Sequence, residues 1–342
     1  MTGMRSGDES GFSIAIDDSS QVGEARRSAT AMAAATGLTE TDAGRIAILA
    51  TEAATNIAKH AGHGELALRT VSSGDLLGVE LIAIDSGPGI PDLDRALTDG
   101  YSTAGSPGTG LGAMSRLATT FDIFTVPGAG TVLTARVESD RGSTRTKRAF
   151  DVGVVRVSKR GESYCGDDWS LVCDEGGRAV LTVADGLGHG QAAADASKRA
   201  VEIGAEQSGG PPGVIVAQIH AGLRSTRGAA IAVAELTSTG TEVRFAGLGN
   251  ISASIVSSKR SKSLVSHNGI AGHEMRKVQE FSYDWPPDAL LVMHSDGVSA
   301  RWDLSRYPGL ALRDPSVVAG VIYRDFSRGR DDALVVVVRP AA

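Results

Sequence analysis

Apolar residues in the first half of the chain recur first at helical spacing and then in strand-like runs. An alanine-rich amphipathic segment covers residues 22–36 and ends at Gly37, and Thr39 with Asp42 forms a capping-box pattern for a second helix that runs to about His60. The strand-like runs, with a glycine-rich stretch and a short helix between them, are residues 65–71, 78–84, 121–126 and 130–137. Helices before and within an antiparallel strand pattern predict an α+β sandwich.

The second half of the chain has a different rhythm, in which short strands surround two helical segments. One helix begins after Gly190 and the other spans about residues 214–223. The strands are expected at residues 152–157, 170–173, 179–183, 229–234, 242–247, 251–255, 290–294 and 333–338. This arrangement predicts two packed sheets with helices outside them.

A polar, charged stretch without hydrophobic periodicity separates the two halves. Residues 138–148 read ESDRGSTRTKR, which is typical of a linker. The chain has 342 residues, and at roughly 100–200 residues per domain this length fits two domains. We therefore expect a first domain at residues 1–140, a linker at 141–149 and a second domain at 150–342.

Composition narrows the class of protein. The chain has 34 basic and 40 acidic residues and a formal net charge of −6, which argues against a nucleic-acid-binding protein. Cys165 and Cys173 are too few for a disulfide framework or a four-cysteine zinc site, and they fit a reducing compartment. No apolar run approaches the roughly 18 residues of a membrane span, and the polar first residues do not form a signal peptide. We expect a soluble, cytoplasmic protein that binds neither nucleic acid nor membranes.

Three polar motifs in the first half point to a nucleotide site. Glu52, Asn56 and His60 share a helix face, where a carboxylate can accept a proton and a carboxamide oxygen can bind Mg²⁺. Asp85 lies between an apolar strand and a Gly-Pro-Gly turn, so its carboxylate can accept a hydrogen bond from the exocyclic amine of adenine. The run GTGLG at residues 108–112 precedes a short helix, and such glycines let backbone amides approach phosphates. Each motif alone also fits a solvated helix face, a capped turn or a chance glycine pattern, but together they favour an ATP pocket.

These motifs lie within residues 40–137, which resemble the GHKL (Bergerat-fold) ATPases through TEAATNIAKHAG, DSGPGI and GTGLG. The closer resemblance is to the small serine kinases of bacterial partner-switching systems, the anti-sigma factor and stressosome switch-kinase group. The run DGYSTAGSPGTGLGAMSRL is similar to the lid of these kinases and the helix that follows it. The resemblance implies that Glu52 is the general base, that Asn56 holds Mg²⁺ and that Asp85 binds adenine. It extends the ATP contacts to Lys59, His60, Gly87, Gly89, Ile90, Thr109, Gly110, Leu111 and Gly112.

Four acidic clusters stand at the ends of expected strands in the second half, in CGDDW, VADGLGHG, HSDGV and GRDDAL. Carboxylates that converge from several strands repel one another unless cations neutralise them. Ligation by oxygen alone selects Mg²⁺ or Mn²⁺ over zinc, and two such ions can lower the pKa of a bridging water and direct it at phosphorus. A single Asp-Gly pair is usually a turn, but four clusters beside apolar strands favour a metal centre.

Residues 150–340 resemble the PPM-type metal-dependent serine/threonine phosphatases, in their SpoIIE-like branch, chiefly through ADGLGHG and FAGLGN. The resemblance implies an α-β-β-α phosphatase sandwich joined to the GHKL α/β sandwich. It gives Asp185 and Asp296 the central catalytic roles. The metal ligands that it implies are Asp185, the Gly186 carbonyl, Asp296 and Asp331.

Adjacent acidic residues leave two of the implied roles open. Asp167 or Asp168 would hold the bound water or a further ion, and Asp167 is preferred. Asp331 is likewise preferred to Asp332 as a ligand. Leu334 stands where this branch usually has Thr, which puts a contact behind the ligands in doubt.

The two resemblances imply opposing activities on one class of substrate. Kinases of this group phosphorylate small STAS-domain anti-sigma antagonists on Ser or Thr, and SpoIIE-like phosphatases remove that phosphate. We therefore expect a bifunctional switch protein that uses ATP with Mg²⁺ or Mn²⁺ and acts on a STAS-domain antagonist or stressosome protein. A sigma factor and a second copy of the chain are further candidate partners. Two alternatives remain: an ATP-binding domain that only regulates the phosphatase, and an anti-sigma factor fused to a phosphatase.

Overall fold

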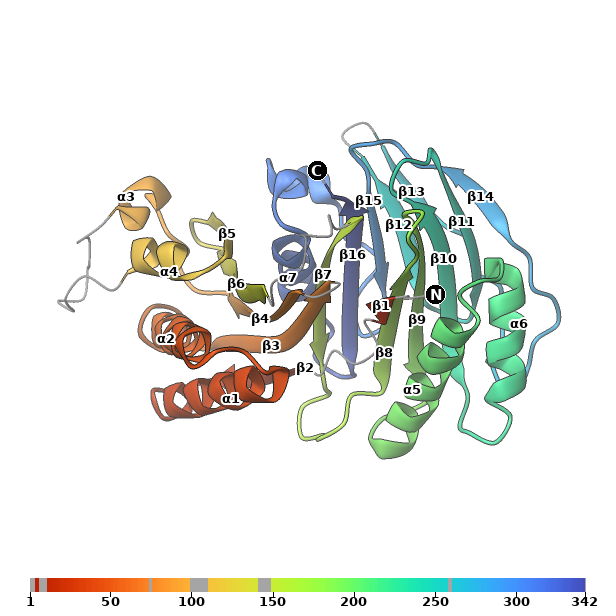
Figure 1. Ribbon diagram of the computed structural model, residues 1–342, viewed down its shortest axis with the longest axis horizontal. Helices are drawn as coiled ribbons and strands as arrows, with labels where there is room; N and C mark the ends of the chain where they lie inside the picture. Colours follow the sequence, from red (N-terminus) through yellow and green to blue (C-terminus); the bar gives the residue numbers. More distant parts are fainter. Residues whose placement is uncertain are drawn as a thin grey trace. The chain divides into compact units, whose positions relative to one another are not determined.

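The computed structural model describes residues 4–5, 11–73, 76–98, 110–140, 149–257 and 260–341, which form two compact units (Figure 1). The N-terminal unit contains residues 9–146 and 312–324, and the C-terminal unit contains residues 1–8, 147–311 and 325–342. The main division falls inside the expected linker, of which residues 141–148 lie outside the described part of the chain. Residues 312–324 group with the N-terminal unit, whereas the expected domains placed them in the second one.

An antiparallel sheet in the order β2-β3-β4-β6-β5 forms the centre of the N-terminal unit, and α1 and α2 pack on one of its faces (Figure 1). The strands are β2 (Gly11–Ile16), β3 (Gly64–Ser73), β4 (Leu76–Asp85), β5 (Thr120–Val126) and β6 (Gly130–Asp140). The helices are α1 (Ser20–Thr36), α2 (Glu40–Asn56), the π-helical turn Ile57–Ala61, α3 (Leu93–Leu97) and α4 (Leu111–Leu117), together with most of α7 (Pro315–Phe326).

Local sequence sets the ends of the two long helices. Gly37 ends α1 in a left-handed conformation with φ 75°, which glycine adopts without steric cost. Thr39 caps α2 because its side chain accepts a hydrogen bond from the Asp42 amide, 3.1 Å long. The expected last turn of this helix continues beyond Asn56 as a π-helical turn, a distortion that is frequent at functional sites.

Alternate residues of β4 face opposite sides of the sheet. Ala83 belongs to the core under α1 and α2, whereas Ile82 and Ile84 face the other side. There α7 approaches closely, because a Cβ on Gly320 would lie 2.5 Å from Cγ1 of Val132. The sheet of the N-terminal unit therefore has α1 and α2 on one face and α7 on the other.

In the described part of the C-terminal unit, two antiparallel sheets pack around a hydrophobic core, and α5 and α6 pack on the outer face of the first (Figure 1). The first sheet is β1 (Met4–Arg5), β8 (Asp167–Cys173), β9 (Arg178–Gly186), β10 (Ala229–Thr237), β11 (Glu242–Leu248) and β14 (Phe281–Asp284). The second is β13 (Ser261–Ser263), β12 (Ser252–Val256), β15 (Leu290–His294), β16 (Ala333–Pro340) and β7 (Phe150–Val157). The helices are α5 (Gln191–Glu206) and α6 (Pro212–Gly222), with short 3-10 turns at Leu304–Arg306 and Leu310–Leu312.

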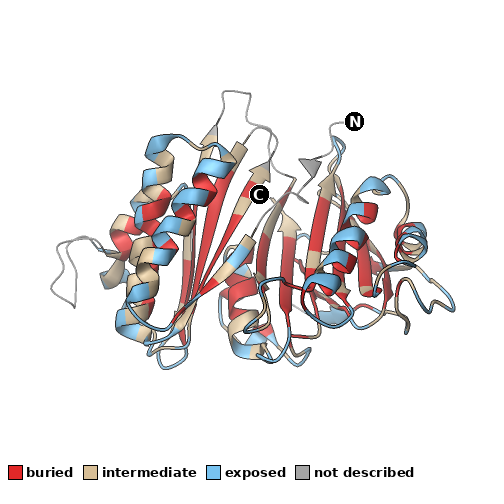
Figure 2. Cartoon of the chain, turned by 90° about the horizontal axis from the view of Figure 1, so that it is seen from below, coloured by how far each residue is buried: buried red, intermediate tan, exposed pale blue. Residues whose placement is uncertain are grey.

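The expected α+β fold class is confirmed in both units. Figure 2 shows buried residues concentrated on the strands and on the helix faces that pack against them. A search of the described residues finds no helix with the length and apolar character needed to cross a bilayer.

Candidate functional site

A cavity of about 530 Å³ lies in the N-terminal unit, where the end of α2, the π-helical turn, β4 and β6 meet. Apolar side chains, including Ile57 and Leu133, form part of its wall. The sequence-predicted residues that line it are Glu52, Asn56, Lys59, His60, Asp85, Gly89, Ile90, Gly110 and Leu111. Gly87 and Gly112 lie just outside the lining, and Thr109 lies outside the described residues.

Asp85 ends β4 and is one of the residues that line this cavity. Its Oδ1 accepts hydrogen bonds from the amides of Gly87 (2.8 Å) and Thr131 (3.3 Å). Burial raises the pKa of Asp85 above its usual range, and these two hydrogen bonds and the charge of Arg324 oppose that rise. The carboxylate is thus held in one orientation by the backbone around it.

The turn after Asp85 requires glycine. Gly89 has φ 69°, and a Cβ at this position would lie 2.3 Å from the carbonyl oxygen of Val126. The chain then continues to Ile90, whose amide donates to Oγ1 of Thr125 over 2.8 Å. This fixed turn forms one edge of the cavity.

Glu52 and Asn56 lie one helical turn apart on α2, and both side chains border the cavity. Lys59 and His60 follow in the π-helical turn and are exposed. Gly110 and Leu111 reach the cavity from the start of α4. The cavity therefore combines carboxylates, a carboxamide and basic side chains with an apolar wall.

Strand register brings predicted acidic residues of the C-terminal unit together. Asp167 at the start of β8 pairs with Asp185 at the end of β9. Asp296 follows β15 and Asp331 precedes β16, and these strands are antiparallel neighbours in the second sheet. Burial, with the charges of Asp296 and Asp331, raises the pKa of Asp185 to about 7. Burial and the charge of Asp185 also raise the pKa of Asp167 well above its usual range.

This carboxylate cluster, formed by Asp167, Asp185, Asp296 and Asp331, has the chemistry of a divalent-cation site. Within the described ranges, no three His, Cys, Asp or Glu side chains are placed to hold one metal ion as they stand. The cluster nevertheless offers only oxygen donors. Burial, and after it the charges of neighbouring carboxylates, raises the pKa of Asp167, Asp185 and Asp296. A divalent cation among them would remove the repulsion between these charges, so the residues fit Mg²⁺ or Mn²⁺.

The structure separates the adjacent acidic residues that the sequence left open. Asp168 follows Asp167 on β8 and so faces the other way, where Arg156 and Lys198 are its charged neighbours. Asp332 accepts hydrogen bonds from the amides of Lys159 (2.7 Å) and Gly166 (2.9 Å), which ties it to a loop.

Gly186 sits where a side chain has no room, because a Cβ would lie 2.1 Å from the carbonyl oxygen of Ala193. Its own amide donates to the carbonyl oxygen of Gly166 over 2.9 Å. These contacts fix the backbone directly after Asp185, where the resemblance placed a carbonyl ligand.

Two polar residues that were not among the predicted site residues contact the cluster. Ser295 donates to Oδ2 of Asp167 over 2.6 Å and accepts from the amide of Leu334 over 3.0 Å. Asn250, the last residue of FAGLGN, donates to Oδ2 of Asp296 over 2.7 Å. Ser295 directly precedes Asp296, and this position in the sequence could have identified it as a site residue. Through its hydrogen bond with the amide of Leu334, Ser295 also supplies a polar contact where Leu334 stands in place of the expected Thr.

Comparison with known proteins assigns both parts of the chain. A model of the histidine kinase-like ATPase domain matches residues 16–137, and a model of stage II sporulation protein E (SpoIIE) matches residues 175–340. The serine/threonine-protein kinase RsbT of Bacillus subtilis (strain 168) is 38% identical over 99 residues, which are 29% of this chain and 74% of RsbT. Through its N-terminal unit the chain belongs to the RsbT-like family of histidine kinase-like ATPases. Its N-terminal unit is an RsbT-like serine/threonine kinase homologue, and its C-terminal unit contains the segment that matches the SpoIIE model.

Two solved structures are similar to parts of this chain. A chain of the structure described as "The bacterial stressosome: a modular system that has been adapted to control secondary messenger signaling" has a TM-score of 0.51 and 27% identity, and the match covers 56% of this chain and 100% of that one. RsbX in complex with magnesium has a TM-score of 0.49 and 16% identity, over 58% of this chain and 99% of RsbX.

Proposed function

We propose that the chain is a bifunctional partner-switching regulator. Its RsbT-like domain phosphorylates Ser or Thr on a STAS-domain protein with ATP, and its SpoIIE-like domain removes that phosphate with Mg²⁺ or Mn²⁺. The observation that carries the proposal is the presence of both sets of site residues in one chain: a cavity lined by Glu52, Asn56 and Asp85, and a separate cluster of buried carboxylates.

In the kinase reaction, the oxygen of the substrate hydroxyl attacks the γ-phosphate of ATP and ADP leaves. Glu52 accepts the proton of that hydroxyl. The side-chain oxygen of Asn56 would hold Mg²⁺, which would neutralise charge on the phosphates. Asp85 receives the adenine amine, because the amides of Gly87 and Thr131 both bind Oδ1 and leave the other oxygen for this contact. Lys59 and His60 would face phosphate oxygens, and Gly110, Leu111 and Gly112, with Thr109 and the glycine turn Gly87–Ile90, would complete the nucleotide contacts.

In the phosphatase reaction, Asp185, the Gly186 carbonyl, Asp296 and Asp331 would hold the metal ions, and Asp167 would hold a further ion or a bound water. Bound Mg²⁺ or Mn²⁺ would supply charge neutralisation at the phosphate and lower the pKa of a water. Ser295 and Asn250 keep the carboxylates of Asp167 and Asp296 in place through their hydrogen bonds. Asp168 has no role in this scheme, because it faces away from the cluster.

The partners follow from the resemblance and from the relatives. RsbT is a serine/threonine-protein kinase, and the first solved structure above comes from work on the bacterial stressosome. These names support a STAS-domain antagonist or stressosome protein as substrate. A sigma factor and a second copy of the chain are further proposed partners, and we propose a cytoplasmic location.

A paired phosphate-transfer assay tests the proposal. The full chain is incubated with a candidate STAS-domain protein, ATP and Mg²⁺, and the product is then transferred to Mn²⁺ without ATP. The intact mass of the STAS-domain protein is followed throughout. Gain of phosphate in the first step and loss in the second support bifunctionality. Loss from a pre-phosphorylated protein without any gain would leave a phosphatase with a regulatory ATP-binding domain.

A further inference from the structure

Helix α7 comes from the part of the chain that carries the carboxylate cluster, yet it packs in the N-terminal unit. It begins at Pro315, 19 residues after Asp296, and ends at Phe326, five residues before Asp331. Residues 312–324 nevertheless belong to the unit that contains the ATP pocket. The segment between two proposed metal ligands is therefore held by the nucleotide-binding fold.

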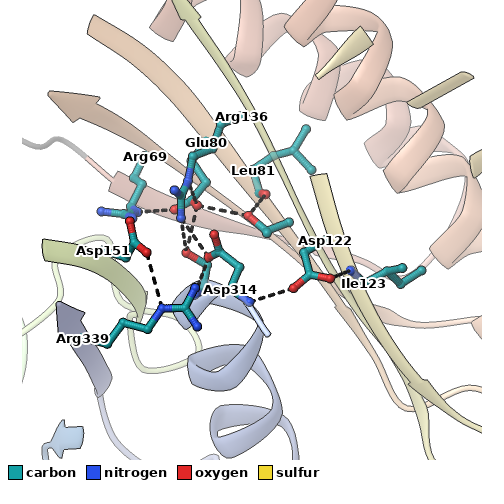
Figure 3. Close-up of polar contacts among 11 residues, drawn as sticks. Arg69, Glu80, Leu81, Asp122, Ile123, Arg136, Asp151, Asp314 and Arg339 are labelled. Carbon is teal, nitrogen blue, oxygen red and sulfur yellow. Dashed lines mark hydrogen bonds and ion pairs between the residues drawn. The ribbon is translucent and has the colours of Figure 1, made fainter. Parts of the chain in front are cut away.

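The start of α7 is fixed by a buried polar cluster on the sheet (Figure 3). Oδ1 of Asp314 accepts from Nη2 of Arg136 over 2.9 Å, and Ser316 donates to Oε1 of Glu80 over 2.8 Å. The amide of Asp314 also donates to Oδ2 of Asp122 over 2.7 Å. Glu80 is fully buried and forms an ion pair with Arg136, so this end of α7 is bound to strands β4, β5 and β6.

The other end of α7 contacts β3, beside the end of β4 that carries Asp85. Tyr323 donates to Oε1 of Glu65 over 2.8 Å. Glu65 lies on β3 directly opposite Ile84, one residue from the pair of Gly64 with Asp85. The charge of Arg324 also acts on the carboxylate of Asp85. Both contacts lie beside the proposed adenine-binding residue.

The alternation of β4 places the pocket and α7 on opposite faces of the same strand. Ala83 and Asp85 line the pocket, whereas Ile82 and Ile84 lie against Gly320 of α7. A Cβ on Gly320 would lie 2.5 Å from Val132 of β6, the strand partner of Ile84, and within 4 Å of Ile82 and Ile84. The helix thus packs directly on the ends of β4 and β6, and close-packed elements transmit small shifts to one another.

We propose that α7 couples nucleotide occupancy of the ATP pocket to the activity of the phosphatase. In this coupling, a change in the position of the end of β4 moves α7, and α7 moves the following segment that carries Asp331. The inference rests on the proposed function only in requiring a working phosphatase. Opposing activities on one substrate would otherwise consume ATP in a futile cycle, so nucleotide binding slows the phosphatase.

The test uses the full chain with Mn²⁺ and p-nitrophenyl phosphate, with and without the non-hydrolysable ATP analogue AMP-PNP. Binding of AMP-PNP is measured on the same samples by calorimetry. We expect the wild-type protein saturated with AMP-PNP to hydrolyse p-nitrophenyl phosphate at about one fifth of its nucleotide-free rate or slower, in the usual range of coupling between two sites. We also expect slower amide hydrogen exchange in residues 315–324 when AMP-PNP is bound.

Tyr323→Phe removes the hydroxyl that binds Glu65 and leaves the ring in place. This variant should bind AMP-PNP and hydrolyse p-nitrophenyl phosphate at the basal rate, but lose most of the response to AMP-PNP. The matched control is Tyr283→Phe, which removes a hydroxyl that accepts from the amide of Val265 within the C-terminal unit. The control should keep the full response.

The outcomes separate this inference from the proposed function. If AMP-PNP binds and the phosphatase works, but neither the rate nor the exchange of α7 changes, the coupling is wrong and the two activities stand. If no hydrolysis is detected, the phosphatase half of the proposed function fails, and the exchange of α7 still decides whether the helix senses nucleotide. A response that survives in Tyr323→Phe as fully as in Tyr283→Phe also overturns the role of α7.

Discussion

Arg136 on β6 forms an ion pair with Asp314, 178 residues later in the chain, with Nη2 2.9 Å from Oδ1. Only 5% of the Arg136 side chain and 12% of the Asp314 side chain are exposed. Burial by itself lowers the pKa of Arg136, but the charges of Glu80 and Asp314 raise it above its usual range. The ion pair thus joins a strand of the ATPase sheet to the start of a helix whose sequence lies in the second half of the chain.

Arg136→Met should strongly destabilise the protein. The substitution removes the cation that Glu80 and Asp314 share and leaves carboxylates in a buried site. Breaking a buried pair by deleting one partner costs about 3–5 kcal/mol. The measurement is the free energy of unfolding in urea at pH 7, followed by circular dichroism.

Arg339→Met is the matched control for that substitution. Nε of Arg339 lies 3.4 Å from Oδ2 of Asp151, and the two side chains are 30% and 27% exposed (Figure 3). Exposed pairs contribute less than about 1 kcal/mol. Equal losses in the two variants would contradict a special role for the buried cluster.

Two substitutions should separate nucleotide binding from phosphate transfer. Asp85→Asn turns an acceptor toward the adenine amine into a group that can present a donor, so ATP affinity should fall roughly tenfold or more. Glu52→Ala should keep ATP affinity and abolish transfer to the substrate, because the general base is lost. Calorimetry with ATP and the mass assay on a STAS-domain protein distinguish the two effects. Neither variant should change hydrolysis of p-nitrophenyl phosphate without nucleotide, and retained ATP affinity in Asp85→Asn would contradict the pocket assignment.

The effect of replacing an acidic residue on hydrolysis should depend on whether that residue faces the carboxylate cluster. Asp185→Asn and Asp296→Asn remove members of the cluster, so Mn²⁺ binding and hydrolysis should fall by more than about 100-fold. Asp168→Asn should keep most activity, because Asp168 faces Arg156 and Lys198 instead. Removal of metal with EDTA should abolish hydrolysis by the wild-type protein, and adding Mn²⁺ back without ATP should restore it. Loss of activity in Asp168→Asn equal to that in Asp185→Asn would place the metal differently.

The motifs and most strands could be predicted from local sequence, because apolar runs bounded by glycine and acidic residues have a regular pattern. The sequence preferred Asp167 to Asp168, but the local pattern gives no physical reason for that preference. Both residues precede the same apolar strand, and the face of each is set by the pairing of Asp167 with Asp185, which is a property of the sheet.

Helix α7 and the polar cluster around Glu80 could not be predicted from the local sequence pattern either. Residues 315–322 of α7 are all buried, so the helix lacks the polar face that makes amphipathic helices visible in a sequence. Glu80 interrupts an apolar strand and would ordinarily mark a solvent-exposed position. It is buried because α7 covers that face of the sheet. Ser316, 236 residues later in the chain, donates a hydrogen bond to Glu80.

The stabilising effect of Glu80 should depend on pH in a defined direction. Burial alone would raise the pKa of this carboxyl, but Arg136 and Arg69 lower it from 4.5 to about 2. A group whose pKa is lowered by folding stabilises the protein above its unfolded pKa, and this contribution is lost as the pH falls toward the folded pKa. The window is therefore about pH 4.5 down to pH 2. A shift of this size corresponds to roughly 3 kcal/mol at pH 7.

Glu80→Gln tests this window, because Gln keeps the shape of the side chain and cannot ionise. The difference in unfolding free energy between wild type and Glu80→Gln should be constant from pH 7 to about 5. It should then shrink by about half or more at pH 3, since the unfolded carboxyl is protonated there while the folded one stays ionised. Urea unfolding at pH 7, 5, 4 and 3 measures the difference. A gap that stays the same down to pH 3 would mean that the charge of Glu80 does not stabilise the cluster and that its hydrogen bonds with Ser316 and Thr134 hold the start of α7.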